Sequence, residues 1–226
     1  LIEQTYPSKE DFDIHFYKML DAFKDSRYYK VNNKLCFYIY APLLIPDIDY
    51  FINRWQALAT KEGLPGFYFI GGCNKKSDIN LASLNSCDAI ALDLKAQAFS
   101  IKYPALRRRL SYLFPFPINV TNYSKAIKRM TDVIFAQNKI YPVVYPNWDH
   151  SPRVGKSGTI FHDSKPILFK KYLKNIIRII NNKNQEDKII FIKSWNEWAE
   201  GNYMEPDLKY GKGYINALRE ALEEFK

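Results

Sequence analysis

The chain has 226 residues, with 33 Lys and Arg against 24 Asp and Glu, and 47% of its residues are apolar. This composition is typical of a folded chain and excludes a disordered one, and the length excludes a small scaffold that depends on disulfides. One large domain or two small ones fit the length, and α/β barrels often have about 200 to 250 residues. No apolar run reaches the ~18 residues that a membrane span needs, so we predict no transmembrane segment.

Apolar residues recur along the chain at helical spacing and in short continuous runs, which predict helices and buried strands respectively. Between residues 95 and 119 three prolines interrupt the pattern and predict a loop-rich insertion with a short helix around 106–112. In chain order the other predicted elements are a helix of about 15 residues after Ser8, a strand at 35–40, a helix at 47–62, strands at 66–70 and 89–92, a helix at 122–136, a strand at 141–145, a helix at 166–181, a strand at 188–194 and a helix at 214–225.

This alternation of five strands with helices predicts an α/β fold with a parallel sheet. No glycine-rich phosphate-binding motif follows any strand, which disfavours a nucleotide-binding doubly wound sheet. A doubly wound sheet of five strands would be complete, whereas a (β/α)8 barrel needs eight. The start at Leu1, without an initiator Met, favours the C-terminal part of a TIM-like barrel. We therefore expect one domain over 1–226 with about five β/α units, its N-terminal strands being absent from this chain.

The cysteines indicate the cellular compartment, and the distribution of charge indicates which binding partners to expect. Cys36, Cys73 and Cys87 are odd in number and form no C-x-x-C pair, which predicts a reducing, cytoplasmic compartment and no structural zinc. We expect no metal and no cofactor. The net charge of +9 is spread over helical faces without a nucleic-acid motif. No nucleic-acid partner is predicted, although a binder of nucleic acid or of an anionic surface, marked by steep salt dependence, stays an alternative.

Chemistry-bearing residues gather after the fourth and fifth predicted strands, where parallel α/β proteins place their sites. After the fifth strand come Glu197 and Glu200, and cleavage of a glycosidic bond needs two carboxyl groups of this kind. Aromatic side chains suit stacking on sugar rings, and polar ones suit hydroxyls or an anionic group. The predicted substrate-binding residues are Trp148, Asp149, His150, Arg153, Trp195, Asn196 and Trp198.

Structural interpretations of the same residues stay open. The two glutamates of an E-x-x-E pattern cap turns in many proteins, and the tryptophans beside them can fill a core. In the loop after the fourth strand, an ion pair from Asp149 to Arg153 that only shapes the loop is the alternative to substrate contact.

The segments I-F-I-K-S-W-N-E-W-A-E-G-N-Y-M-E-P-D at 190–207 and N-W-D-H-S-P-R at 147–153 resemble the WbsX-type family of bacterial lipopolysaccharide and polysaccharide biosynthesis proteins. The opening L-I-E-Q-T-Y and the segments Y-Y-K-V-N-N-K-L and E-G-L-P-G-F-Y are similar to the same family, so the resemblance covers nearly the whole chain. Family members are usually named glycosyltransferases, yet they look like the endo-α-mannosidases of glycoside hydrolase family 99, which are (β/α)8 barrels.

The resemblance implies roles for both glutamates. By position in the N-E-W-x-E motif, Glu197 resembles the carboxylate that assists the sugar 2-hydroxyl in attacking its own anomeric carbon. Glu200 resembles the general acid/base that protonates the departing oxygen, with net retention of configuration. The hydrolases have His where this chain has Ala199, so the sugar and the choice between hydrolysis and transfer stay open. Longer family members would supply the rest of the barrel.

The expected function is therefore that of a carbohydrate-active enzyme of surface-polysaccharide (lipopolysaccharide or O-antigen) biosynthesis, either a glycosyltransferase or a retaining glycoside hydrolase. Its expected partners are an oligosaccharide or polysaccharide substrate and, at the membrane surface, a peripheral contact with a lipid-linked glycan. A glycan-binding module without catalysis is the alternative, in which the glutamates only hydrogen-bond hydroxyls.

Overall fold

A computed structural model describes residues 5, 8–99 and 119–225 of the chain. The chain divides into two compact units, Leu1–Leu92 and Asp93–Lys226. Both alternate helices and strands, so the predicted α/β class is confirmed. The short helix predicted around 106–112 lies outside the described residues. No helix in the described part of the chain is both long enough and apolar enough to span a bilayer.

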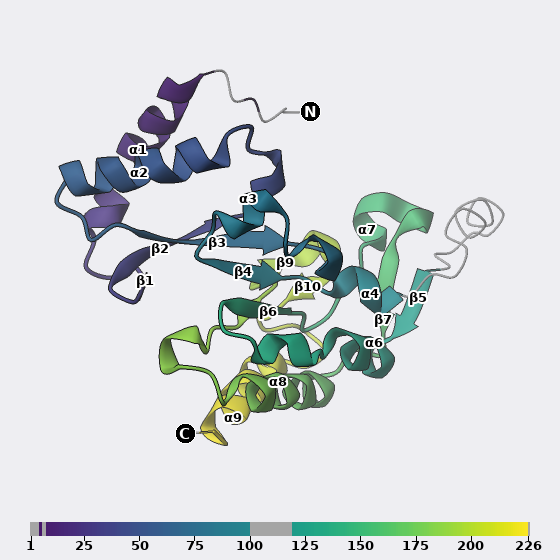
Figure 1. The fold of residues 1–226 in the computed structure, drawn as a ribbon. Coiled ribbons are helices and arrows are strands. Elements are labelled where there is room, and N and C mark those ends of the chain that lie inside the picture. The colour runs from purple at the N-terminus through teal and green to yellow at the C-terminus, as the bar shows by residue number, and fades with distance from the viewer. Residues whose placement is uncertain (1–4, 6–7, 100–118, 226) are drawn as a thin grey trace. The chain divides into compact units, whose positions relative to one another are not determined.

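The first unit is a sheet with helices on it. Strands β2, β3 and β4 run parallel, and β1 is antiparallel to β2. Helices α1 and α2 lie side by side over this sheet (Figure 1). The elements are α1 (Lys9–Lys24), β1 (Lys30–Val31), β2 (Lys34–Ile39), η1 (Pro42–Leu44), α2 (Ile48–Lys61), β3 (Phe67–Cys73), η2 (Lys76–Asp78), α3 (Ala82–Asn85) and β4 (Ala89–Leu92).

An aromatic core holds the helices of the first unit on its strands. Trp55 of α2 is fully buried, and its indole Nε1 donates a hydrogen bond of 3.0 Å to the carbonyl of Phe12 in α1. Its ring lies 5.4 Å, between centroids, from that of Phe67 on β3. Helix α2 starts where predicted, because the Asp47 side chain accepts a hydrogen bond from the backbone of Tyr50.

The second unit holds two parallel strand pairs and a short hairpin. β5 pairs with β7 and β6 pairs with β8, both in parallel, whereas β9 and β10 are antiparallel. Helices α8 and α9 pack side by side (Figure 1). The elements are α4 (Lys95–Phe99), β5 (Asn119–Asn122), α6 (Tyr123–Met130), η3 (Val133–Ala136), β6 (Ile140–Val144), α7 (Ser151–Val154), η4 (Gly155–Ser157), β7 (Thr159–His162), α8 (Pro166–Ile180), η5 (Gln185–Asp187), β8 (Phe191–Ile192), β9 (Asn196–Glu197), η6 (Trp198–Glu200), β10 (Asn202–Tyr203) and α9 (Gly213–Glu223).

Two sequence predictions are wrong in this unit. The single helix predicted over 122–136 ends at Met130, because Thr131 leaves helical geometry and Asp132 caps a new 3₁₀ turn through the backbone of Ile134. The loop predicted over 146–165 contains β7, which pairs with β5. Each of these strands has four residues, too few to give a periodic signal, and β5 carries two asparagines.

Candidate active site

The loops that carry the predicted site leave one edge of a parallel strand pair. β6 and β8 align Val144 with Ile192, so both strands end at the same level. Just beyond, the backbone of Lys193 donates a hydrogen bond of 2.9 Å to the carbonyl of Val144. The carboxyl edge of such a pair is where α/β folds place their sites.

The W-N-E-W-A-E-G segment folds as a tight hairpin just after β8. Glu197 ends β9 and pairs with Asn202 of β10. The 3₁₀ turn η6 joins the two strands and ends at Glu200. The hairpin thus carries Glu197 at the end of its first strand and Glu200 at the end of the turn that follows.

Hydrogen bonds from backbone amides join this hairpin to the loop that follows β6. The amide of Asp149 donates to the carbonyl of Glu200 at 2.8 Å, and the amide of Tyr203 donates to Oδ1 of Asn147 at 2.9 Å. Gly201 adopts a left-handed conformation with φ of +49°, and a Cβ there would lie 2.8 Å from the Cβ of Asp149. Only glycine fits this close approach without strain.

Glu200 lies beside a guanidinium group and an imidazole ring. Its Oε1 accepts a hydrogen bond of 3.0 Å from Nη1 of Arg153, and Nε2 of His150 lies 3.5 Å from the same oxygen. The Glu200 side chain is only 16% exposed. Arg153 therefore pairs with Glu200, and the predicted alternative of an ion pair from Asp149 to Arg153 is wrong.

Glu197 has a different environment. Its side chain is half-buried, and within the described part of the chain its carboxylate makes no hydrogen bond or ion pair. This carboxylate is open to a hydroxyl donor, whereas the carboxylate of Glu200 already holds Arg153. The two glutamates of the motif thus have unequal surroundings.

Other predicted site residues occupy supporting positions. Oδ1 of Asp149 accepts hydrogen bonds from the backbone and hydroxyl of Ser151, so this side chain holds the turn that leads into α7. Trp148 is only 4% exposed, and its Nε1 donates to Thr159 at 2.9 Å. Trp148 therefore has no open ring face for the stacking role predicted for it.

The tryptophans of the hairpin are open. Trp195 is 53% exposed and Trp198 is 47% exposed, and Asn196 between them on β9 is exposed as well. The Trp198 ring stacks on Tyr203 at 3.8 Å between centroids, and its Nε1 donates to Glu205 at 2.6 Å. These contacts fix the plane of one exposed aromatic face, as a sugar-binding surface requires.

A buried charged cluster beneath the site is missing from the sequence prediction. Asp93, 9% exposed, accepts hydrogen bonds from the Tyr145 hydroxyl and the backbone of Lys95, and Nζ of Lys193 lies 3.7 Å from it. Nζ of Lys95 lies 3.2 Å from the centroid of the Trp148 ring, a cation–π contact. No motif marks these residues, since only the fold brings them together.

Burial lowers the pKa of Lys95 to about 8, with Lys193 acting in the same direction and Asp93 and Glu200 opposing it. The unfolded chain therefore holds more protons than the folded one between about pH 8 and 10.5, and the contribution of Lys95 to the free energy of unfolding rises with pH there. We expect the stability of the wild type relative to Lys95→Met to increase between pH 7.5 and 9.5 in urea unfolding. The exposed Lys18→Met variant serves as control, and a constant difference for Lys95→Met would contradict the assignment.

Among the described residues, no three His, Cys, Asp or Glu side chains gather in a group that could hold a metal ion.

The sequence model of a family described as Glycosyltransferase WbsX matches residues 1–218. The chain belongs to this WbsX family. Two curated relatives, both described as uncharacterized protein WxcX, come from two strains of Xanthomonas campestris pv. campestris. Each is 25% identical over 228 residues, which are 98% of this chain and 31% of the relative. This WbsX chain thus spans about a third of the length of these relatives.

Two solved structures share the fold of this WbsX chain. A glycoside hydrolase-like protein has a TM-score of 0.65 and 18% identity, over 97% of this chain and 62% of its own. The GH99 endo-alpha-mannosidase from Bacteriodes thetaiotaomicron, in complex with BIS-TRIS-Propane, has a TM-score of 0.57 and 19% identity, over 96% of this chain and 65% of its own. The resemblance of the sequence to this hydrolase family thus extends to the fold.

Proposed function

We propose that this chain carries the catalytic carboxylates of an enzyme that cleaves or transfers at a glycosidic bond in bacterial surface-polysaccharide biosynthesis, including lipopolysaccharide, with retention of configuration. The observation that carries the proposal is the hairpin of 196–203. It follows β8 and holds Glu197 at the end of β9 and Glu200 at the end of η6, beside two exposed tryptophans.

In the proposed first step, Glu197 accepts the proton of the sugar 2-hydroxyl while that oxygen attacks the anomeric carbon. Glu200 donates a proton to the departing glycosidic oxygen, so the leaving sugar departs as an alcohol and a 1,2-anhydro sugar remains. In the second step Glu200 accepts a proton from the incoming hydroxyl as it attacks the anomeric carbon. Glu197 returns its proton to the 2-oxygen. Two inversions at one carbon give net retention.

The other residues would hold the sugar. Trp195 and Trp198 present ring faces for stacking, and Asn196 lies between them on the same strand. Arg153 and His150 face Glu200 and would orient its carboxyl group. The buried Trp148, and Asp149 through its hydrogen bonds to Ser151, would act indirectly, by setting the shape of the loop that contacts the hairpin.

The proposal also covers the rest of the protein. We take 1–226 as the C-terminal part of a single TIM-like barrel domain in the cytoplasm, whose remaining strands belong to a longer chain. The WbsX match over 1–218 and the fold shared with longer glycoside hydrolase-like proteins support this view. Its substrate would be an oligosaccharide or a lipid-linked glycan.

The test is the stereochemistry of the product. The full-length protein is incubated with surface polysaccharides and lipid-linked oligosaccharides, and proton NMR follows the first anomeric signal to appear. Retention is expected, with the configuration of the cleaved linkage present in the first product before mutarotation. Initial inversion would overturn the two-step mechanism. Tight glycan binding without any turnover would show that the protein is a glycan-binding module and not an enzyme.

A further inference from the structure

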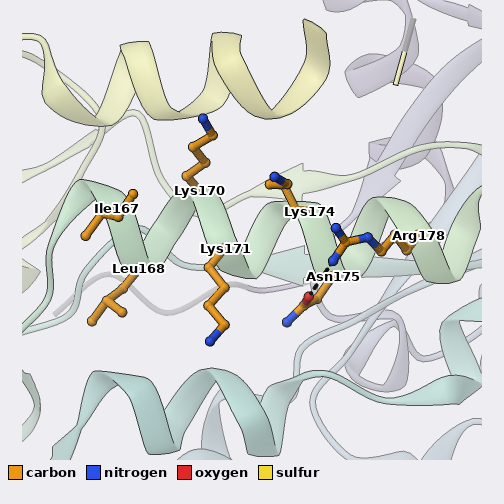
Figure 2. A pocket seen from close by; sticks show the side chains of 7 residues that line it. All are labelled: Ile167, Leu168, Lys170, Lys171, Lys174, Asn175 and Arg178. Carbon is orange, nitrogen blue, oxygen red and sulfur yellow. Dashed lines mark hydrogen bonds between the residues drawn. The ribbon is translucent and has the colours of Figure 1, made fainter. Parts of the chain in front are cut away.

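A basic pocket lies along α8, away from the hairpin of the proposed active site. Its volume is about 360 Å³, and its walls are side chains of a single helix (Figure 2). The lining carries no carboxylate. The residues that line it include Ile167, Leu168, Lys170, Lys171, Lys174 and Arg178.

The four cations of this pocket differ in their partners. Lys170 forms ion pairs with Glu220 of α9 and with Glu224, which follows that helix, and Lys174 pairs with Glu224. In Figure 2 Lys170 points toward α9, whereas Lys171 points away from it. Within the described part of the chain neither Lys171 nor Arg178 has a carboxylate partner. Arg178 donates a hydrogen bond of 3.3 Å to Oδ1 of Asn175 and lies 6.0 Å from the centroid of the Phe225 ring. Neither contact neutralises its charge, so these two exposed cations can take an anion from outside.

One exposed apolar side chain lines the pocket with these cations, and another lies on an element that packs against α8. Ile167 lines the same pocket and is 67% exposed. Val133 of η3, which packs against α8, is 80% exposed. Helix α6 packs against α8 and adds the exposed Lys125 and Lys128 to the local positive field. Cations next to exposed aliphatic groups on a helix surface match the boundary between phosphate headgroups and acyl chains.

We propose that this α8 surface binds the phosphate headgroups of an anionic bilayer. Lys171 and Arg178 would contact phosphate oxygens, and Ile167 and Val133 would enter the headgroup layer. A soluble phosphate would use the cations but leave the two aliphatic side chains exposed, so the bilayer fits the whole surface better. The proposal goes beyond the proposed function, because it needs neither glutamate of the hairpin.

The test is flotation of the full chain with vesicles of pure phosphatidylcholine and with vesicles that contain 30% phosphatidylglycerol. We expect binding only to the anionic vesicles, and loss of that binding in high salt. Each juxtamembrane Lys or Arg contributes about 1 kcal/mol to such binding, so Lys171→Gln with Arg178→Gln should weaken it about 30-fold. The matched control replaces the exposed Lys18 and Lys75 of the first unit by Gln and should bind almost as the wild type does.

Several results would overturn the proposal. These are an absence of binding to anionic vesicles, equal binding to neutral ones, and equal losses in the α8 variant and its control. Saturable binding of inorganic phosphate or pyrophosphate without vesicle binding would make the pocket a site for a soluble anion instead. Circular dichroism shows whether both variants fold. Glu200→Gln should bind vesicles as the wild type does, which separates this result from that for the proposed function.

Discussion

Glu200→Gln should lower glycosidic turnover by about 10²- to 10⁴-fold, because an amide cannot donate a proton to the departing oxygen or accept one from the incoming hydroxyl. Affinity for the glycan should persist, since Gln keeps the size and most of the hydrogen-bonding capacity of Glu. The measurement is kcat together with the dissociation constant of the same glycan. If Glu200 is catalytic, kcat falls while the dissociation constant stays the same. If the chain is a binding module, the dissociation constant also stays the same, but the wild type shows no turnover either.

Glu197→Gln should also lower turnover strongly, but with a different dependence on the leaving group. An aryl leaving group needs little protonation, so the first step of Glu200→Gln should recover on an aryl glycoside. Glu197→Gln should not recover, since activation of the 2-hydroxyl is still required. Comparing sugar and aryl leaving groups in both variants thus assigns the two roles. Equal recovery in the two variants would contradict the assignment made from the motif.

Glu223→Gln on α9 is the matched control for both variants. It removes the same charge from an exposed position far along the chain from the hairpin, and its side chain is free of ion pairs within the described residues. Turnover should be unchanged in this variant. A loss comparable to that of Glu200→Gln would point to net charge rather than to a catalytic carboxylate.

The meeting of the two loops was predictable from the sequence because the signals are local. Continuous apolar runs mark β6 and β8, and polar, tryptophan-containing segments follow each of them directly. Parallel strands end at a common edge, so the two loops meet as the hydrogen bond between Asp149 and Glu200 demonstrates. The hairpin itself is harder to foresee, since each of its strands has only two residues.

Partners of individual side chains were not accessible in the same way. Nothing in the sequence distinguishes the exposed Trp195 from the buried Trp148, because burial depends on which residues the fold brings against each ring. Lys95 and Asp93 follow a predicted strand without any motif, and their contacts with Tyr145 and Trp148 span about 50 residues. Such long-range pairs arise from packing and produce no periodic pattern in the amino-acid sequence.

Gly201→Ala should disrupt the site by straining the backbone of the hairpin and displacing it from Asp149. At φ of +49° an alanine costs roughly 1 to 2 kcal/mol, and its Cβ would lie 2.8 Å from the Cβ and 3.1 Å from the amide nitrogen of Asp149. One or both loops must shift, and the carbonyl of Glu200 loses its alignment with the Asp149 amide. Since a displacement of about 1 Å costs up to 10²-fold in rate, turnover should fall by about that factor. Chemical unfolding and kcat measure the two effects.

Gly211→Ala separates backbone strain from the close approach. Gly211 has a similar φ of +53°, but a Cβ there would meet nothing within 4 Å. Both variants should therefore lose similar stability from the left-handed backbone, while only Gly201→Ala should lose turnover beyond the effect of stability. Comparable activity in the two variants would mean that the contact between Asp149 and the hairpin does not position Glu200. A loss confined to Gly201→Ala would tie catalysis to the junction of the two loops.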